Sequence, residues 1–113
     1  MIIDSRIIRA TLGDDQALIR EAATDFLSSA RADMARIRKA MSASDAEGVW
    51  GGSHSIKGAS GMFGASELKH LCTELESAAR DNNWNGIRAL VPKLAIMLRE
   101  VEVGIGDYLE RMP

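Results

Sequence analysis

One histidine of the sequence, His54, stands among residues whose types and spacing could support chemistry. His54 lies in the run from Trp50 to Gly64, which has helical spacing although each interior glycine costs a helix about 1 kcal/mol relative to alanine. At about 100° per residue, the face of His54 also carries residues without a side chain: Gly51, Gly58 and Gly61. Lys57 lies one turn ahead of the histidine. We therefore predict a lone imidazole on a bare surface, with a cation beside it, where another protein surface comes close.

A carboxylate on the following helix can reach this histidine. If the intervening turn is centred near Ala65, His54 lies eleven positions before it and Glu76 eleven after it, so the two are level. A carboxylate bonded to one ring nitrogen fixes the tautomer and leaves the other nitrogen free and more basic. Lys57 at i+3 supplies positive charge on the same side of the helix, and Gly58 at i+4 leaves room for a phosphoryl donor. The set suits nucleophilic attack on phosphorus.

Apolar residues recur at spacings of three and four along the chain, which indicates amphipathic helices. The first is a short helix capped by Asp4 and stopped by Gly13, and a long helix starts at Asp14-Asp15. No segment alternates at period two over a strand's length. Because short connections make neighbouring helices antiparallel, we predict an all-α fold, an antiparallel four-helix bundle with a short extra N-terminal helix, in a single domain over residues 1–113.

Capping residues and helix breakers set the boundaries of the later helices. Ser44 begins a capping-box pattern and is expected to start the glycine-bearing helix, which ends near Gly64. Ser66 is expected to cap the next helix, and the run 81–83 ends it. Pro92 interrupts the final helix, where we expect a kink or a restart.

Composition argues against several classes of partner and location. The formal net charge of −2 gives no support for nucleic acid or an anionic membrane as partner. The single cysteine, Cys72, excludes an internal disulfide, fits a reducing compartment and lies on an apolar stripe as a small core residue. No apolar run approaches the ~20 residues of a membrane span, and no secretory signal precedes the fold. We therefore expect a cytoplasmic protein without membrane contact, and a monomer because its apolar stripes suffice for one bundle.

The string from His54 to Ala65, followed by Leu68, Leu71 and Leu75-Glu76, resembles the histidine phosphotransfer (Hpt) domain. It contains that family's His-x-x-Lys-Gly core with a downstream glycine, and the helical layout is compatible over essentially the whole chain. The resemblance implies a phosphocarrier without its own kinase or hydrolase site, in which His54 takes a phosphoryl group from one receiver-domain aspartate and passes it to another. Response-regulator receiver domains and a hybrid sensor histidine kinase are the implied partners. No cofactor is expected on this chain, and Mg²⁺ is expected on the partner receiver.

Two other functions stay open at this point. The string also looks like the phosphoacceptor domain of chemotaxis-type histidine kinases, in which a glutamate at the Glu76 position hydrogen-bonds the histidine. In that case the chain is a module of a larger autokinase with an ATP-binding domain elsewhere. The kinase dimerisation pattern His-Glu-x-x-x-Pro is absent, since Ser55 follows His54. The second alternative is a helical bundle that docks receivers without being phosphorylated.

We expect four residues to carry the chemistry: His54 as phosphoacceptor, Lys57, Gly58 and Glu76. A further set is expected to bind the partner: Trp50, Gly51, Gly61, Lys69 and Arg80. Simpler interpretations exist for several of them. Glu76 could be an exposed carboxylate paired with Arg80, Lys69 and Arg80 could be solvated, and Trp50 could cover the bundle. Close helix packing would explain Gly48 and Gly52 but not Gly58 and Gly61.

The second histidine, His70, falls on the polar face of its helix and is expected to be solvated. A metal site made from His54, Glu76 and His70 would need ligands to converge from two faces of one helix. We therefore predict no metal site.

Overall fold

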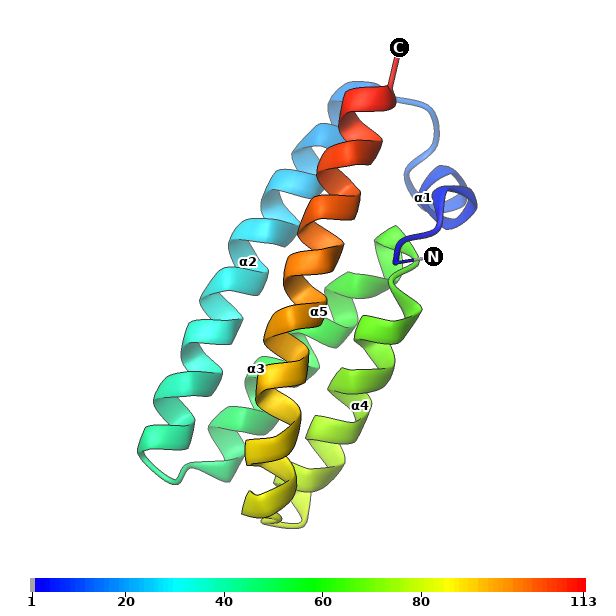
Figure 1. Cartoon of the computed structure of the whole chain (residues 1–113). Helices are drawn as coiled ribbons and strands as arrows, with labels where there is room; N and C mark the ends of the chain where they lie inside the picture. Colours follow the sequence, from blue (N-terminus) through cyan, green and yellow to red (C-terminus); the bar gives the residue numbers. More distant parts are fainter. Residues whose placement is uncertain (1) are drawn as a thin grey trace.

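The computed structural model describes residues 2–113, and within that range the chain is all-helical, with no strand. Five α-helices and one 3₁₀ turn follow in chain order: α1 (Ser5–Leu12), α2 (Gln16–Ser42), α3 (Ala46–Ser60), η1 (Gly61–Phe63), α4 (Ser66–Arg80) and α5 (Trp84–Arg111). The four long helices lie side by side, and the chain reverses direction at each connection between them (Figure 1). The all-α prediction is confirmed. None of the helices in residues 2–113 combines the length and apolar composition that a membrane span requires.

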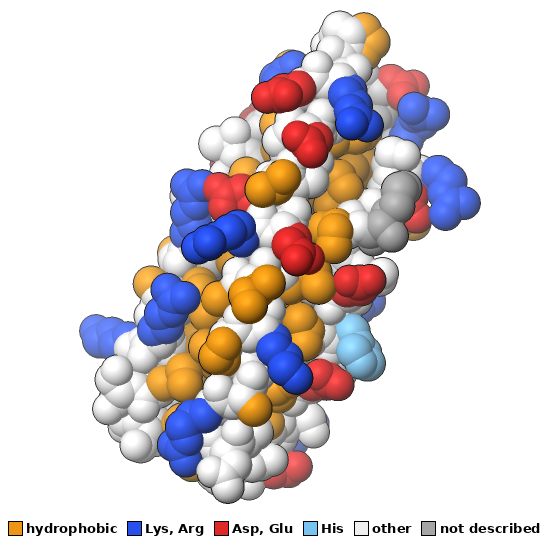
Figure 2. All heavy atoms as spheres, in the orientation of Figure 1, with side chains coloured by type: hydrophobic (Ala, Val, Ile, Leu, Met, Phe, Trp, Pro, Cys, Tyr) orange, Lys and Arg blue, Asp and Glu red, His pale blue; other side chains and the backbone are white. Residues whose placement is uncertain are grey.

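α3 is the helix with the most extensive packing. It contacts α2 on one side and α4 on the other, while α5 contacts α4 and, more lightly, α2. The whole is a rod of 46 × 21 × 19 Å. The face of α5 and α2 seen in Figure 2 carries basic and acidic side chains interspersed with apolar ones, which agrees with the small net charge.

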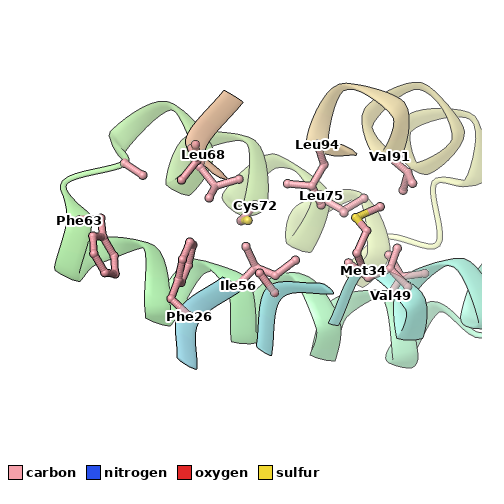
Figure 3. Packing of buried hydrophobic residues seen from close by; sticks show 14 of the residues in the cluster. Phe26, Met34, Val49, Ile56, Phe63, Leu68, Cys72, Leu75, Val91 and Leu94 are labelled. Atoms are coloured by element: carbon pink, nitrogen blue, oxygen red, sulfur yellow. The ribbon is translucent and has the colours of Figure 1, made fainter. Parts of the chain in front are cut away.

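Each long helix turns its apolar stripe inward. Figure 3 shows side chains of all four helices meeting in one core, among them Phe26 and Met34 of α2, Ile56 of α3, Leu75 of α4 and Leu94 of α5. The rings of Phe26 and Phe63 lie 5.4 Å apart and close the core near the α3–α4 connection. Full burial of one such side chain contributes about 1.5–3 kcal/mol, so this core holds α3 in place despite its glycines.

Two glycines let α3 approach α2 closely. A Cβ added at Gly52 would lie 2.5 Å from Cγ1 of Ile37, and one added at Gly48 would lie 2.8 Å from Cβ of Ala40. These distances are too short for real contacts, so the two positions need glycine. The prediction that Gly48 and Gly52 serve helix packing is confirmed. The contact also fixes the rotation of α3, which buries Ile56 and leaves His54 exposed.

The short α1 is attached to the α3–α4 connection. The backbone N–H of Asp4 donates to the carbonyl oxygen of Phe63 at 2.9 Å, and Ile8 is fully buried. Gly64 has φ +62°, and a Cβ there would lie 2.6 Å from Cβ of Asp4. The glycine-bearing segment therefore ends near Gly64 as predicted, although its last residues form the 3₁₀ turn η1.

The termini of the first two helices agree with the sequence. The carboxylate of Asp4 accepts from the N–H of Arg6, and Gly13 ends α1 with φ +73°. At α2 the carboxylate of Asp15 accepts from the N–H of Leu18 at 3.2 Å. Acidic side chains at these positions also interact favourably with the helix dipole.

Two predicted caps of the later helices are wrong, and of the two outcomes expected at Pro92, a kink or a restart, the restart does not occur. Asp45 caps α3 in place of Ser44, since its carboxylate accepts from the N–H of Gly48 at 3.0 Å while Ser44 adopts φ +53°. Ser66 is the first residue of α4, and the N-cap position before it makes no side-chain hydrogen bond. α5 does not restart at Pro92, because buried residues on both sides of the proline keep the helix on the core.

Candidate functional site

The imidazole of His54 meets the carboxylate of Glu76 between α3 and α4. Nδ1 of His54 lies 2.8 Å from Oε1 of Glu76, so the contact predicted across the turn is present. Glu76 is only 5% exposed, and the alternative of a solvated carboxylate paired with Arg80 is wrong. The His54 side chain is 56% exposed. A buried acceptor thus holds one edge of an accessible ring.

The charge state of Glu76 decides which nitrogen of His54 is free. Burial by itself raises the pKa of Glu76, but hydrogen bonds from Lys57 and His54 outweigh it and hold the pKa below its ordinary value. Glu76 is therefore ionised at neutral pH and can only accept hydrogen bonds. In the neutral form of the ring, Nδ1 of His54 then carries the proton and donates it, which leaves an unshared electron pair on Nε2. Within residues 2–113 the ring makes no second hydrogen bond.

Lys57 shares the same carboxylate. Its Nζ lies 2.7 Å from Oε2 of Glu76, so each oxygen of Glu76 accepts from a different partner. An ammonium group has three N–H donors, and this contact uses one of them. The lysine side chain is 25% exposed. Lys57 therefore stands beside His54 as predicted, but anchored by Glu76, with N–H donors that this contact leaves unused.

Trp50 stacks on the ring of His54. The two ring centroids are 4.7 Å apart and the planes differ by 10°. The i, i+4 spacing along α3 brings the two side chains together on one face. The sequence placed Trp50 one turn before His54 and suggested docking or cover for it, whereas the structure shows direct contact with the imidazole.

The glycines around His54 fall into two groups. A Cβ added at Gly58 or Gly61 would meet nothing within 4 Å, so both leave the surface open as predicted. At Gly51 the expectation of a bare surface is wrong, because an added Cβ would lie 2.5 Å from a guanidinium nitrogen of Arg36. The side chain of Arg36 reaches from α2 over α3 and covers this position. The open strip near His54 therefore runs toward Gly61, not toward Gly51.

The two predicted docking cations lie outside the cluster of His54, Lys57 and Glu76. Lys69 lines an open hollow of about 310 Å³ together with Gly61 and other residues near the α3–α4 connection. Arg80 lines another hollow together with Trp50. Both side chains are exposed. They flank the stretch from Trp50 to Gly61 at its two ends, so neither touches the imidazole.

The remaining titratable groups that drew interest from the sequence have ordinary structural surroundings. His70 is exposed and its Nε2 lies 3.4 Å from Oε1 of Glu74. Cys72 is fully buried, as predicted, and burial raises its pKa to about 12. In the part of the chain that the structure describes, no three His, Cys, Asp or Glu side chains are grouped to hold a metal ion.

Sequence reasoning missed two features of this face. Arg36 over Gly51 links residues on two helices, and no local spacing signals such a contact. Ser55 donates to Oδ2 of Asp33 at 2.6 Å, again between α3 and α2. The stack of Trp50 on His54 was not predicted either, although the i, i+4 spacing of two rings on one helix face could have indicated it.

Comparisons with known proteins bear on the family and the fold of the chain. The family model of the Hpt domain matches residues 21–104. Among solved structures, the chain is similar to histidine-containing phosphotransfer protein B (HptB) from Pseudomonas aeruginosa PAO1, with a TM-score of 0.90 and 22% sequence identity over 99% of this chain and 97% of that one. At this identity the likeness shows a shared fold. The comparison with curated proteins gave no match.

Proposed function

The chain belongs to the Hpt domain family, and from that premise we propose that it is a phosphocarrier of a two-component phosphorelay. In this proposal Nε2 of His54 accepts a phosphoryl group from a receiver-domain aspartate and passes it to another receiver. The observation that carries the proposal is the hydrogen bond between Nδ1 of His54 and the buried, ionised Glu76, which makes Nε2 the nitrogen with the free electron pair in the neutral ring, on a side chain that is 56% exposed. The chain would be an intermediate in transfer, with no kinase or hydrolase site of its own.

The transfer step balances without a proton acceptor. The electron pair of Nε2 forms the bond to phosphorus while the bond from phosphorus to the aspartate oxygen breaks, and its electron pair stays on that carboxylate. The ring of His54 keeps the proton on Nδ1 and becomes positively charged. Glu76 compensates this charge through the 2.8 Å hydrogen bond. Return of the phosphoryl group to a second aspartate is the same step in reverse.

The neighbours of His54 have roles that follow from their positions. Glu76 orients the ring and selects the tautomer. Lys57, anchored by Glu76 at 2.7 Å, directs its remaining N–H donors to the charge on the phosphoryl oxygens, which is the main demand of phosphoryl transfer on a protein. Gly58, with open space beside its Cα, lets the partner's aspartate come in line with Nε2.

The partner in this proposal is a receiver domain. One such receiver would belong to a hybrid sensor histidine kinase. It would dock over the open strip at Gly58 and Gly61, with Lys69 and Arg80 at the two ends of the contact surface. Trp50 borders the same surface. Gly51 lies beneath Arg36, so contact there would be made with the arginine. Mg²⁺ is expected on the receiver, beside its aspartate.

The scaffold in this proposal is an antiparallel four-helix bundle in one domain over residues 1–113, acting as a cytoplasmic monomer. The packing of α3 between α2 and α4, with α5 beside α4, supports the bundle. On α3 of this bundle, His54, Ser55 and Gly58 are exposed.

The test uses both histidines of the chain. A receiver labelled with ³²P on its aspartate is mixed with wild type, His54→Gln and His70→Gln. His70 is the matched control, because it is also exposed and also lies near a carboxylate, at 3.4 Å from Glu74. We expect acid-labile, base-stable label on wild type and His70→Gln and none on His54→Gln.

Binding measurements separate this proposal from docking alone. If folded wild type binds receivers but takes no label from any of them, the chain docks without phosphorylation and the proposal is wrong. Label that survives in His54→Gln and disappears in His70→Gln would equally refute the assignment to His54. Label that appears with ATP and a separate kinase domain, but with no receiver, would favour the phosphoacceptor module of a chemotaxis-type kinase.

A further inference from the structure

We propose that Trp50 is a positioning residue for His54, and that its indole face stabilises the positive charge of the ring once His54 is phosphorylated. This inference rests on the proposed function, since it concerns the same ring and the same transfer step. Trp50 would be a second stabilising group besides Glu76. It acts on the face of the His54 ring, whereas Glu76 acts at the edge. The observation behind it is the nearly parallel stack of the two rings, with centroids 4.7 Å apart.

The stack and the hydrogen bond together fix the direction of Nε2. The bond from Nδ1 to Glu76 holds one point of the ring at 2.8 Å, but by itself it allows the ring plane to rotate about the line joining the two atoms. Contact with the indole of Trp50 removes that rotation. Since effective transfer depends on holding the reacting atom in the attack direction, the two contacts preorganise Nε2 for an incoming phosphorus atom.

The charge of the ring makes the stack stronger after phosphorylation. An aromatic face carries negative potential and attracts a cation, and tryptophan does so most strongly. The reacting form of the His54 ring is neutral, since Nε2 needs its electron pair to attack phosphorus, and the ring is positively charged after transfer because the proton on Nδ1 stays in place beside Glu76. Trp50 therefore interacts more favourably with the phosphorylated ring. It shifts the transfer equilibrium toward this chain, and does not merely change a rate.

This property separates the proposal from a docking role for Trp50. A residue that only helps the receiver to dock changes the forward and reverse rates by the same factor. It leaves the equilibrium between the separated proteins unchanged. A residue that stabilises the charged ring changes the equilibrium constant itself. The measurement to make is therefore the final distribution of label, not its speed.

The first experiment compares the equilibrium constant for transfer from a phosphorylated receiver among wild type, Trp50→Leu, Trp50→Phe and Trp84→Leu. Trp84 is the matched control, because it is the chain's other tryptophan, is also partly buried, and lies at the start of α5 without stacking on a histidine in residues 2–113. We expect the constant to fall about two- to fivefold in Trp50→Leu. Trp50→Phe should lie between, because it keeps a weaker aromatic face. Trp84→Leu should match wild type.

The second experiment reads the stack directly and needs no receiver. Phosphoramidate, a chemical phosphodonor for histidine, is added to Trp84→Phe, in which Trp50 is the remaining tryptophan. An electron-poor ring stacked on an excited indole accepts an electron and quenches its fluorescence. We expect the emission of Trp50 to drop as a phosphohistidine signal appears by ³¹P NMR, and to recover as the label hydrolyses. His54→Gln in the same background should show no drop.

Two results would overturn the inference. One is an equilibrium constant for Trp50→Leu equal to that of wild type, or lowered equally in Trp84→Leu, with both variants folded by circular dichroism. The other is unchanged emission of Trp50 while His54 becomes phosphorylated. If phosphoramidate labels His54 but no receiver does, the proposed relay function fails, and the fluorescence result alone still decides the role of Trp50.

Discussion

Glu76→Gln tests the reasoning about the site most directly. The glutamine side chain has nearly the same shape and keeps one oxygen acceptor, but it removes the charge that both His54 and Lys57 contact. Its amide nitrogen is also a donor, so it can donate to Nδ1 of His54 and place the ring proton on Nε2. That tautomer has no electron pair where the phosphorus must bind. We expect transfer to slow by about tenfold or more, which corresponds to at least about 1.4 kcal/mol in the barrier.

The loss of stability can be worked out from the contacts. Glu76 is 5% exposed and accepts two hydrogen bonds, at 2.8 and 2.7 Å. A hydrogen bond to a charged group contributes about 1.5–3 kcal/mol. The variant keeps one weaker neutral bond, and the ammonium of Lys57, already 25% exposed, regains water. We expect unfolding free energy to fall by about 2 kcal/mol at pH 7, or a Tm roughly 6–10 °C lower.

The pH dependence of the free energy of unfolding provides a second test, and the direction of the pKa shift of Glu76 sets its sign. Because the pKa of Glu76 in the folded chain lies below its ordinary value of 4.5, the folded state holds fewer protons at this site than the unfolded state. The stabilisation that ionised Glu76 contributes is fully present above pH 4.5 and is lost as the pH falls through the pKa of Glu76 in the folded chain. The stability gap between wild type and Glu76→Gln should therefore narrow below pH 4.5, as measured by urea denaturation across the pH range.

A matched control is available on the same helix. Glu74→Gln removes an exposed carboxylate that lies 3.4 Å from His70, and its side chain is 47% exposed. We expect it to change stability by no more than about 0.5 kcal/mol and to leave transfer unchanged. If Glu76→Gln behaves like Glu74→Gln, or if the gap between wild type and Glu76→Gln is the same at pH 3 and pH 7, the charge of Glu76 does not hold the site as we argue.

Three further predictions concern the glycines and the cysteine. Gly52→Ala places a Cβ against the buried side chain of Ile37 and should lower the free energy of unfolding by about 1–3 kcal/mol. In Gly106→Ala the added Cβ meets nothing within 4 Å, so this variant should be more stable than wild type by about 0.5–1 kcal/mol. Chemical denaturation would contradict the reasoning if Gly52→Ala were the more stable of the two. Gly58→Leu should leave the chain folded but slow phosphoryl transfer by on the order of a hundredfold, because the partner is displaced, and transfer at the wild-type rate would show that no surface comes close there. Burial raises the pKa of Cys72 from 9.0 to about 12. The free energy of unfolding should therefore decline as the pH rises above 9. Iodoacetamide should label the thiol only as the chain unfolds, and mass spectrometry can follow the labelling.

The sequence predicted those parts of the structure that depend on short-range rules. The spacing of apolar residues gave the helices, and Asp4, Gly13 and Asp15 end or begin them as acidic caps and glycine stops should. The level of Glu76 relative to His54 followed from counting residues on either side of one turn. That count succeeded because the 3₁₀ turn and Gly64 keep the connection short.

The errors arose where several local solutions compete or where another helix decides. Asp45 and Ser44 are both residue types that cap helices. The carboxylate of Asp45 makes the capping hydrogen bond, and Ser44 adopts a left-handed turn conformation. Periodicity placed Gly51 on the face of His54 but gave no information about a long side chain from α2, so Arg36 was missed. Pro92 would break an isolated helix, yet burial of Val91 and Leu94 keeps α5 continuous.

The glycine content of α3 has a consequence for how His54, the proposed phosphoacceptor, can be studied. Four glycines within its 15 residues make the isolated helix about 4 kcal/mol less favourable than an alanine-rich one, and short peptides are marginal helices in any case. A synthetic peptide spanning α3 would therefore be a disordered coil. Its histidine would lack the carboxylate of α4 and a fixed ring plane. The orientation of the His54 ring thus depends on the folding of the whole bundle, and a peptide of α3 alone would not reproduce it.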